Sequence, residues 1–176
     1  KGEVSDYGEI TRLALRAPAL RSFIRPDDIR FAKRGDMVAK VQAFCRETKQ
    51  PIPRTHGEIA RCVLESLALL YRVEMDAMEQ LTGRRISVLH IVGGGCRNAL
   101  LNQATADATG RTVVAGPVEA TAAGNILVQA IAMKEVKDLE GVRSIVRKSF
   151  EVVTYKPRTE ARWAQALAKF NGLKKS

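Results

Sequence analysis

The sequence predicts an α/β fold in which helices pack on a small sheet, and three observations support this prediction. Residues Ile86 to Val92 form an almost continuously apolar run that is rich in β-branched side chains, as expected of a strand. A glycine turn and a helical pattern follow this run, and a second strand followed by a helix begins at Thr112. Apolar residues make up 45% of the 176 residues, which is enough for a core of ordinary domain size.

The N-terminal segment predicts a short helix and then a loop. Either Ser5 or Asp6 can cap the helix, because short polar side chains accept hydrogen bonds from the first free N–H groups. We expect the helix to end near Ala17. Residues 21–35 are charged and show no hydrophobic period, so they predict a loop.

Two helices with clear boundaries follow. Asp36 precedes a helical pattern from Met37 to about Thr48, so it is interpreted as an N-cap and not as a catalytic base. Residues Gly57–Leu81 predict a long amphipathic helix. Its apolar residues recur at steps of three and four and are Ile59, Val63, Leu67, Leu70, Val73, Ala77 and Leu81. Its opposite, solvated side is predicted to carry Arg61, Glu65, Arg72 and Glu79.

The second half predicts alternating strands and helices. Because the Ile86–Val92 run has no polar face, we expect this strand to be buried on both faces, with His90 packed inside. The strand–helix–strand order favours parallel pairing. The other predicted elements are helices at about Asn98–Thr109, Ala120–Met133, Leu139–Arg147 and Glu160–Phe170, a strand at Thr112–Ala115 and an extended segment at Phe150–Tyr155.

Gly93, Gly94 and Gly95 connect the first predicted strand to the next helix and give the sharpest local signal. Glycines lack Cβ atoms, and the first N–H groups of a helix have no partner within it. Such a turn can receive a phosphate or a ribose at the end of a strand. A tight turn without a ligand fits the local pattern equally well. The run does not match a dinucleotide fingerprint, because Asn98 occupies the position of the third glycine, and no P-loop lysine follows.

Charge and composition exclude several classes of function. Lys and Arg total 29 against 19 Asp and Glu, and the net charge of +10 suits an anionic partner. The basic residues are scattered and aromatic residues make up only 5%, so a nucleic-acid-binding face is disfavoured. No apolar run is long enough for a membrane span and no secretory signal pattern is present, so we expect a soluble, cytoplasmic protein.

The three cysteines predict neither a disulfide scaffold nor a zinc site, because their spacing matches none of the usual patterns. Cys45 and Cys62 lie on consecutive predicted helices, so we expect their side chains to be neighbours. In a reducing compartment they stay free thiols, although a bridge is compatible with this placement. Cys96, beside the glycine turn, is expected to be the thiol most sensitive to alkylation.

A longer set of residues resembles a known family. The strings HIVGGGCRN at 90–98, LNQ at 101–103, TADATG at 105–110 and VVAGPVEATA at 113–122 closely resemble the C-terminal domain of the FGGY carbohydrate kinases, within the actin-like ATPase superfamily. Further matches at 35–37, 42–48, 61–68 and 157–163 extend the resemblance over nearly the whole chain. The string VAGPVEATA favours the branch that phosphorylates L-rhamnulose over the glycerol, xylulose or gluconate branches.

The resemblance implies a ribonuclease H-like, mixed sheet packed with helices. Residues 1–176 would form most of an ATP-binding C-terminal lobe, with the N-terminal sugar-binding domain absent from this sequence. The whole kinase would use ATP and Mg²⁺ to convert L-rhamnulose into L-rhamnulose 1-phosphate. Alternatives that stay open are another FGGY kinase (xylulose, fuculose or glycerol type), a non-catalytic actin-like nucleotide-binding module and a basic nucleic-acid-binding domain.

The resemblance also assigns roles to particular residues. Gly93, Gly94, Gly95 and Asn98 would contact the nucleotide, with Asn98 near the base or ribose. No catalytic or metal-binding residue is expected in this chain, because the catalytic base lies upstream, so the chain alone would be inactive. Asp107 is interpreted as a solvated or capping carboxylate, and His56 as a residue at a helix start. Glu119 either interacts favourably with the dipole of the next helix or helps to shape the nucleotide pocket.

Overall fold

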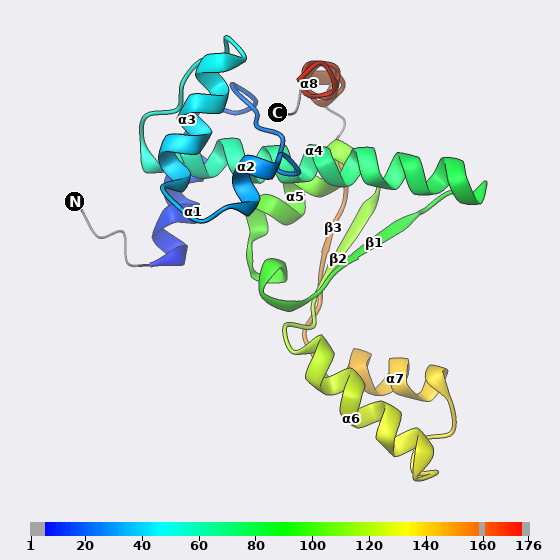
Figure 1. Cartoon of the computed structure of the whole chain (residues 1–176). Helices are drawn as coiled ribbons and strands as arrows, with labels where there is room; N and C mark the ends of the chain where they lie inside the picture. The colour runs from blue at the N-terminus through cyan, green and yellow to red at the C-terminus, as the bar shows by residue number, and fades with distance from the viewer. Residues whose placement is uncertain (1–5, 159–160, 174–176) are drawn as a thin grey trace.

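The computed structural model describes residues 6–158 and 161–173. Its long central helix separates a group of helices from a small sheet, and a hairpin of two helices extends beyond the far end of the sheet (Figure 1). The helices are α1 (Tyr7–Arg16), α2 (Ile29–Ala32), α3 (Met37–Glu47), α4 (His56–Thr82), the 3₁₀ turn η1 (Gly93–Arg97), α5 (Ala99–Thr109), α6 (Ala120–Ala132), α7 (Leu139–Ser149) and α8 (Ala161–Asn171). The strands are β1 (Val88–Ile91), β2 (Thr112–Ala115) and β3 (Val153–Tyr155).

The three strands form a mixed sheet in the order β1-β2-β3. Strands β1 and β2 are parallel, and His90 lies opposite Val114. Strand β3 is antiparallel to β2 and places Thr154 opposite Val114. The mixed sheet implied by the family resemblance is therefore present, and the parallel pairing predicted from the strand–helix order holds for β1 and β2.

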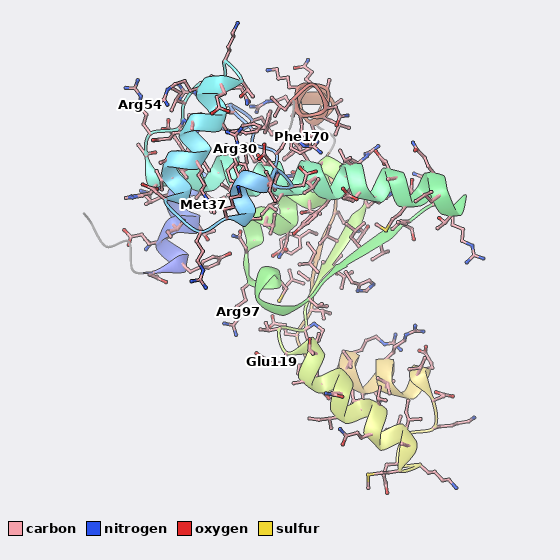
Figure 2. All side chains as sticks on the ribbon, in the orientation of Figure 1. Arg30, Met37, Arg54, Arg97, Glu119 and Phe170 are labelled. Carbon is pink, nitrogen blue, oxygen red and sulfur yellow. The ribbon has the colours of Figure 1, made fainter. Side chains whose placement is uncertain are left out.

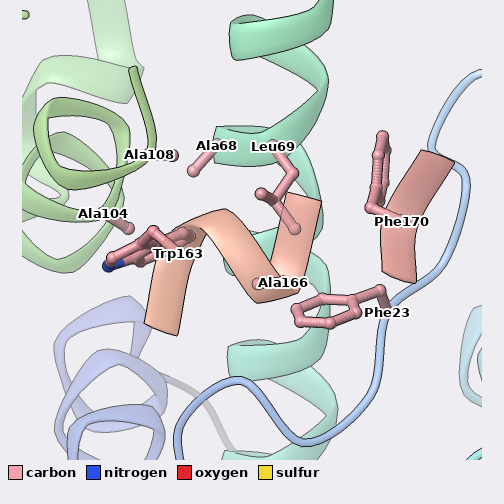
Figure 3. Packing of buried hydrophobic residues seen from close by; sticks show 8 residues of the cluster. All are labelled: Phe23, Ala68, Leu69, Ala104, Ala108, Trp163, Ala166 and Phe170. Carbon is pink, nitrogen blue, oxygen red and sulfur yellow. The ribbon is translucent and has the colours of Figure 1, made fainter. Parts of the chain in front are cut away.

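The main core lies where α4, α5 and α8 meet (Figure 3). Its large side chains are Phe23, Leu69, Trp163 and Phe170, all of them buried. Phe23 comes from the segment 21–35, which was predicted as a loop. That prediction is wrong in part: the segment contains α2 and buries Phe23 and Ile24, which a count of its charges does not show.

Two predictions of burial are also wrong. Strand β1 is exposed on alternate residues, and His90 is exposed rather than packed inside. The reason is that α5 covers only the face of the sheet that carries Val113 and Ala115. Conversely, Glu65 was predicted on a solvated side but is 2% exposed, because α1 packs along that side of α4.

Helix ends follow the capping residues that the sequence indicates. Asp6 accepts the Gly8 N–H and Asp36 accepts the Ala39 N–H, as predicted for N-caps, while Ser5 lies outside the described residues. The N-cap of α4 is Thr55, which forms a reciprocal capping box with Glu58. Within the described part of the chain, none of the helices has the length and apolar character needed to cross a membrane.

The capping box makes the stability of α4 depend on pH. Hydrogen bonds from the Arg54 and Thr55 N–H groups lower the pKa of Glu58 below its ordinary value. A carboxyl whose pKa is lowered by folding stabilises the protein above its unfolded pKa, and this contribution is lost as pH falls through the folded pKa. We expect Glu58→Gln to reduce the free energy of unfolding by about 1 kcal/mol at pH 7 and by much less near pH 3.

Urea unfolding of both proteins across this pH range measures the effect. Glu74→Gln, on an exposed side of α4, is the matched control and should show no such change with pH. A constant difference between Glu58→Gln and the parent protein at all pH values would contradict the assignment.

Candidate functional site

The glycine turn lies at the carboxyl end of β1 and forms the 3₁₀ turn η1. Gly93 has a φ of +74°, which a residue without a Cβ adopts at little cost. Its N–H donates to the Pro117 carbonyl at 3.1 Å, so the turn after β1 is tied to the turn after β2. A Cβ built on Gly94 would meet no atom of residues 6–158 and 161–173 within 4 Å, so this part of the chain does not require a glycine there.

Asn98 closes the turn and starts α5. Its Oδ1 accepts the Leu101 N–H at 3.0 Å as an N-cap, and its Nδ2 donates to the Tyr7 hydroxyl at 2.9 Å. The residue is 2% exposed. Its side chain is thus already engaged within the chain, and a side-chain contact with a nucleotide would use the second lone pair of Oδ1 or replace Tyr7.

Asn102 lies on α5 and holds the glycine turn in place through a hydrogen bond. It is not among the site residues predicted from the sequence. It is fully buried, and its Nδ2 donates to the Cys96 carbonyl at 2.8 Å. Its Oδ1 is a buried side-chain oxygen that has no hydrogen-bond partner among the described residues. A polar residue among Leu100, Leu101 and Ala104 was the available signal for this support. The contact of Tyr7 with Asn98 spans 91 positions and leaves no local signal in the sequence.

The turn after β2 completes this end of the sheet. Gly116 has a φ of +116° and donates its N–H to the Ile91 carbonyl at 2.8 Å. A Cβ on Gly116 would lie 2.9 Å from the Glu151 carbonyl oxygen, so a side chain is excluded there. Figure 2 shows Arg97 on the glycine turn and Glu119 at the start of α6, both at the end of the sheet away from α4. Glu119 occupies the N-cap position, but its side chain makes no capping bond.

The other candidate residues have structural roles. Asp107 was predicted to be a solvated or capping carboxylate, but its side chain is 1% exposed and pairs with Arg158 at 2.6 Å. That prediction is wrong because Lys156 and Arg158 lie against α5, where the Lys156 carbonyl accepts from Gln103 and the Arg158 N–H donates to Asp107. Asp36 caps α3, and His56 is the first residue of α4, as predicted. Among the described residues, no three His, Cys, Asp or Glu side chains come together as a metal site would require.

Cys45 and Cys62 are neighbours, as predicted, and lie with Ile24, Val41 and Phe44 in a second buried cluster; both are free thiols. The hydrogen bond between them raises the pKa of Cys62 and lowers that of Cys45. Both thiols are at most 2% exposed, whereas Cys96 is partly exposed beside the glycine turn.

The difference in solvent exposure between Cys96 and the two buried thiols predicts selective alkylation. In the native protein iodoacetamide should modify Cys96 and leave Cys45 and Cys62 unreacted, and in denaturant it should modify all three. Mass spectrometry of digested protein gives the sites, and Cys96→Ser is the control that should abolish the native reaction. Modification of Cys62 as fast as Cys96 would show that the second cluster is not packed as described.

Comparison with known proteins supplies the family. Residues 1–133 match the model of the C-terminal domain of the FGGY family of carbohydrate kinases. The chain belongs to the FGGY family. The glycine turn and α5 lie within the matched range.

Curated relatives of the FGGY chain are rhamnulokinases. Over 151 residues the chain is 48% identical to the rhamnulokinase of Enterococcus faecalis. This alignment covers 85% of this chain and 31% of that protein. Over 166 residues the chain is 44% identical to the rhamnulokinase of Bacteroides thetaiotaomicron. This alignment covers 94% of this chain and 34% of that protein. The chain therefore spans about one third of the length of these relatives.

Solved structures of two sugar and glycerol kinases share the fold. Xylulose kinase from Rhodospirillum rubrum matches 97% of this chain with a TM-score of 0.63 and 20% identity, and 34% of that protein is covered. Glycerol kinase from Plasmodium falciparum, solved with ADP, matches 96% with a TM-score of 0.68 and 16% identity, and 33% of it is covered. The predicted actin-like ATPase fold is confirmed.

Proposed function

We propose that this chain is the ATP-binding C-terminal lobe of a kinase that phosphorylates L-rhamnulose to L-rhamnulose 1-phosphate. The observation that carries the proposal is the open glycine turn at the end of β1, in a chain 43–48% identical to three rhamnulokinases. The domain assignment to residues 1–176 and a cytoplasmic location are parts of the same proposal. The N-terminal part of the same kinase supplies the sugar-binding domain.

The described residues fit the adenosine side of ATP. Because Gly94 has no Cβ and no neighbour within 4 Å on that side, a flat or charged ligand can approach the main chain closely. The Gly93 N–H donates to the Pro117 carbonyl, so the N–H groups proposed to face such a ligand are those of Gly94 and Gly95, because a helix has no internal acceptor for its first N–H groups. In the proposed complex, Gly93, Gly94 and Gly95 form the cradle, and Asn98 fixes its downstream end through the cap on α5.

Mg²⁺ is proposed to enter with the phosphates of ATP, where it offsets the negative charge that develops during transfer. This chain contributes no group of three metal-ligating side chains within its described residues, so its role toward the metal is to position the nucleotide. The proposed catalytic base, which orients the sugar hydroxyl, lies upstream of this chain. Asp36 does not serve, because its carboxylate accepts the Ala39 N–H at the start of α3.

A coupled ADP-release assay tests the function. The longer kinase should turn over with L-rhamnulose faster than with xylulose, fuculose or glycerol, and the 176-residue chain should show no sugar-dependent turnover. Preference for another of these sugars would support the alternative FGGY kinase. ATP binding without turnover on any sugar would instead support a non-catalytic nucleotide-binding module. Sugar-dependent turnover by the chain alone would overturn the proposal, and Asp36 would then become the candidate base.

A further inference from the structure

Tyr7, the first residue of α1, combines an anchored hydroxyl with an exposed ring. The residue is 58% exposed, yet its hydroxyl accepts a hydrogen bond of 2.9 Å from Asn98 Nδ2. Asn98 ends the glycine turn, and its N–H donates to the Gly95 carbonyl at 3.1 Å. The start of α1 and the glycine turn lie on the same side of α4 (Figure 1). The phenol ring is thus fixed beside the turn, while the described residues leave much of its surface uncovered.

The helix that carries Tyr7 is held firmly on α4. Asp6 caps the first turn of α1 and so fixes the backbone next to Tyr7. The two helices come very close at Gly57, where a Cβ would lie only 2.5 Å from the Leu13 carbonyl oxygen. Arg61, also on α4, donates to three carbonyls near the other end of α1. Because the helix is anchored along its length and the hydroxyl is bonded, both ends of the Tyr7 side chain are fixed.

An aromatic ring placed in this way suits a flat ligand. Aromatic side chains stack on nucleobases, because every base has a π face. A side chain whose orientation is fixed before binding loses little conformational entropy when the ligand arrives. The adjacent turn offers main-chain N–H groups but no planar surface, so the ring and the turn supply different kinds of contact to the same ligand.

We propose that Tyr7 is a nucleotide-binding residue, that the base stacks on its ring, and that the hydrogen bond to Asn98 sets the angle of the ring. The inference rests on the proposed function, in which the adenosine side of ATP lies on the glycine turn. A purine has a larger π face than a pyrimidine, so this contact favours purine nucleotides. Tyr7 thereby adds base selectivity to a turn whose N–H groups do not distinguish one base from another.

The same contact has an opposite interpretation, in which the Tyr7 hydroxyl occupies part of the ligand's place and must leave before a nucleotide binds. Displacement would remove the acceptor of Asn98 Nδ2, and Asn98 is only 2% exposed. A polar group that loses its partner in a buried position costs free energy. Stacking on the exposed ring breaks no hydrogen bond, so the structure favours stacking over displacement.

Calorimetric titration of the longer kinase with ADP and with CDP tests the proposal without turnover. Tyr7→Ala should weaken ADP binding about tenfold and CDP binding by less, so that the preference for ADP over CDP shrinks. Tyr7→Phe should bind ADP within about threefold of the parent protein, because it keeps the ring. Leu15→Ala is the matched control, since Leu15 is 55% exposed on the same helix, and it should change neither Kd.

Each outcome decides the proposal. A smaller preference for ADP in Tyr7→Ala, with the parent preference kept in Tyr7→Phe, supports it. Equal weakening of ADP and CDP, or a parent protein without preference for ADP, overturns it, because the ring would then not contact the base. Tighter ADP binding by both variants also overturns it and identifies the hydroxyl as an obstacle. Unchanged binding in Tyr7→Ala overturns this inference alone, whereas a parent protein that does not bind ADP overturns the proposed function as well.

Discussion

Gly94→Val should raise the KM of the longer kinase for ATP about tenfold or more, equivalent to about 1.4 kcal/mol, and leave the KM for the sugar unchanged. A valine side chain would occupy the space where the nucleotide must approach the main chain. The protein itself should tolerate the change, because a Cβ at this position meets no atom of the described residues within 4 Å and Gly94 does not have a positive φ. Steady-state kinetics with each substrate varied in turn measure both constants.

Gly93→Val is the matched control, because Gly93 has a φ of +74° that strains any side chain. It should lower the melting temperature as well as the affinity, whereas Gly94→Val should leave the melting temperature nearly unchanged. A similar rise in both KM values for Gly94→Val would indicate general misfolding and contradict the placement of the nucleotide.

Glu65→Ala should destabilise the fold by about 3 to 5 kcal/mol, which lowers the melting temperature by about 10 °C for a protein of this size. The Glu65 carboxylate is 2% exposed, pairs with Arg61 Nε at 2.8 Å and accepts the Leu20 N–H at 2.7 Å. Arg61 Nη1 in turn donates to the carbonyls of Ala14, Leu15 and Ala17 at the end of α1. The substitution leaves a partly buried guanidinium without its counter-charge and removes the acceptor of the partly buried Leu20 N–H.

The double variant Arg61→Met with Glu65→Leu measures how much of the stability depends on the interaction between these two residues. It should lose less stability than the sum of the two single substitutions, because neither charge is left alone. Thermal unfolding followed by circular dichroism provides the values. Strict additivity would mean that the two residues do not act as a pair.

Much of the fold follows from local chemistry. The ends of α3 and α4 lie within two residues of their predicted positions, because Asp36 and Gly83 act through the adjacent backbone. The exposed face of β1 and the burial of Glu65 depend on which elements pack from outside, and no pattern within one element carries that information. Helix α2 is four residues long, too short to show a period.

The candidate site also combines features that are local in the sequence with contacts that depend on the tertiary structure. Three consecutive glycines after a strand located the turn at 93–95 from sequence alone, because a strand-to-helix glycine turn is a local motif. The contacts that hold it are of two kinds. Asn102 reaches back only six positions to the Cys96 carbonyl, whereas Tyr7 arrives from a helix 91 positions upstream of Asn98. The first was recoverable from a polar residue among Leu100, Leu101 and Ala104, and the second required the tertiary structure.

The position of bound nucleotide is the most direct test of the proposed site at the glycine turn. Amide chemical shifts of the ¹⁵N-labelled chain can be followed while ADP is added up to tens of millimolar, because half of a cleft should bind with a Kd on the order of 1 mM. We expect saturable shifts that are centred on Gly93, Gly94 and Gly95 and that disappear in Gly94→Val. Saturable shifts centred instead on the polar pocket of Arg61, Arg158 and Arg162, and unchanged in Gly94→Val, would contradict the proposed site.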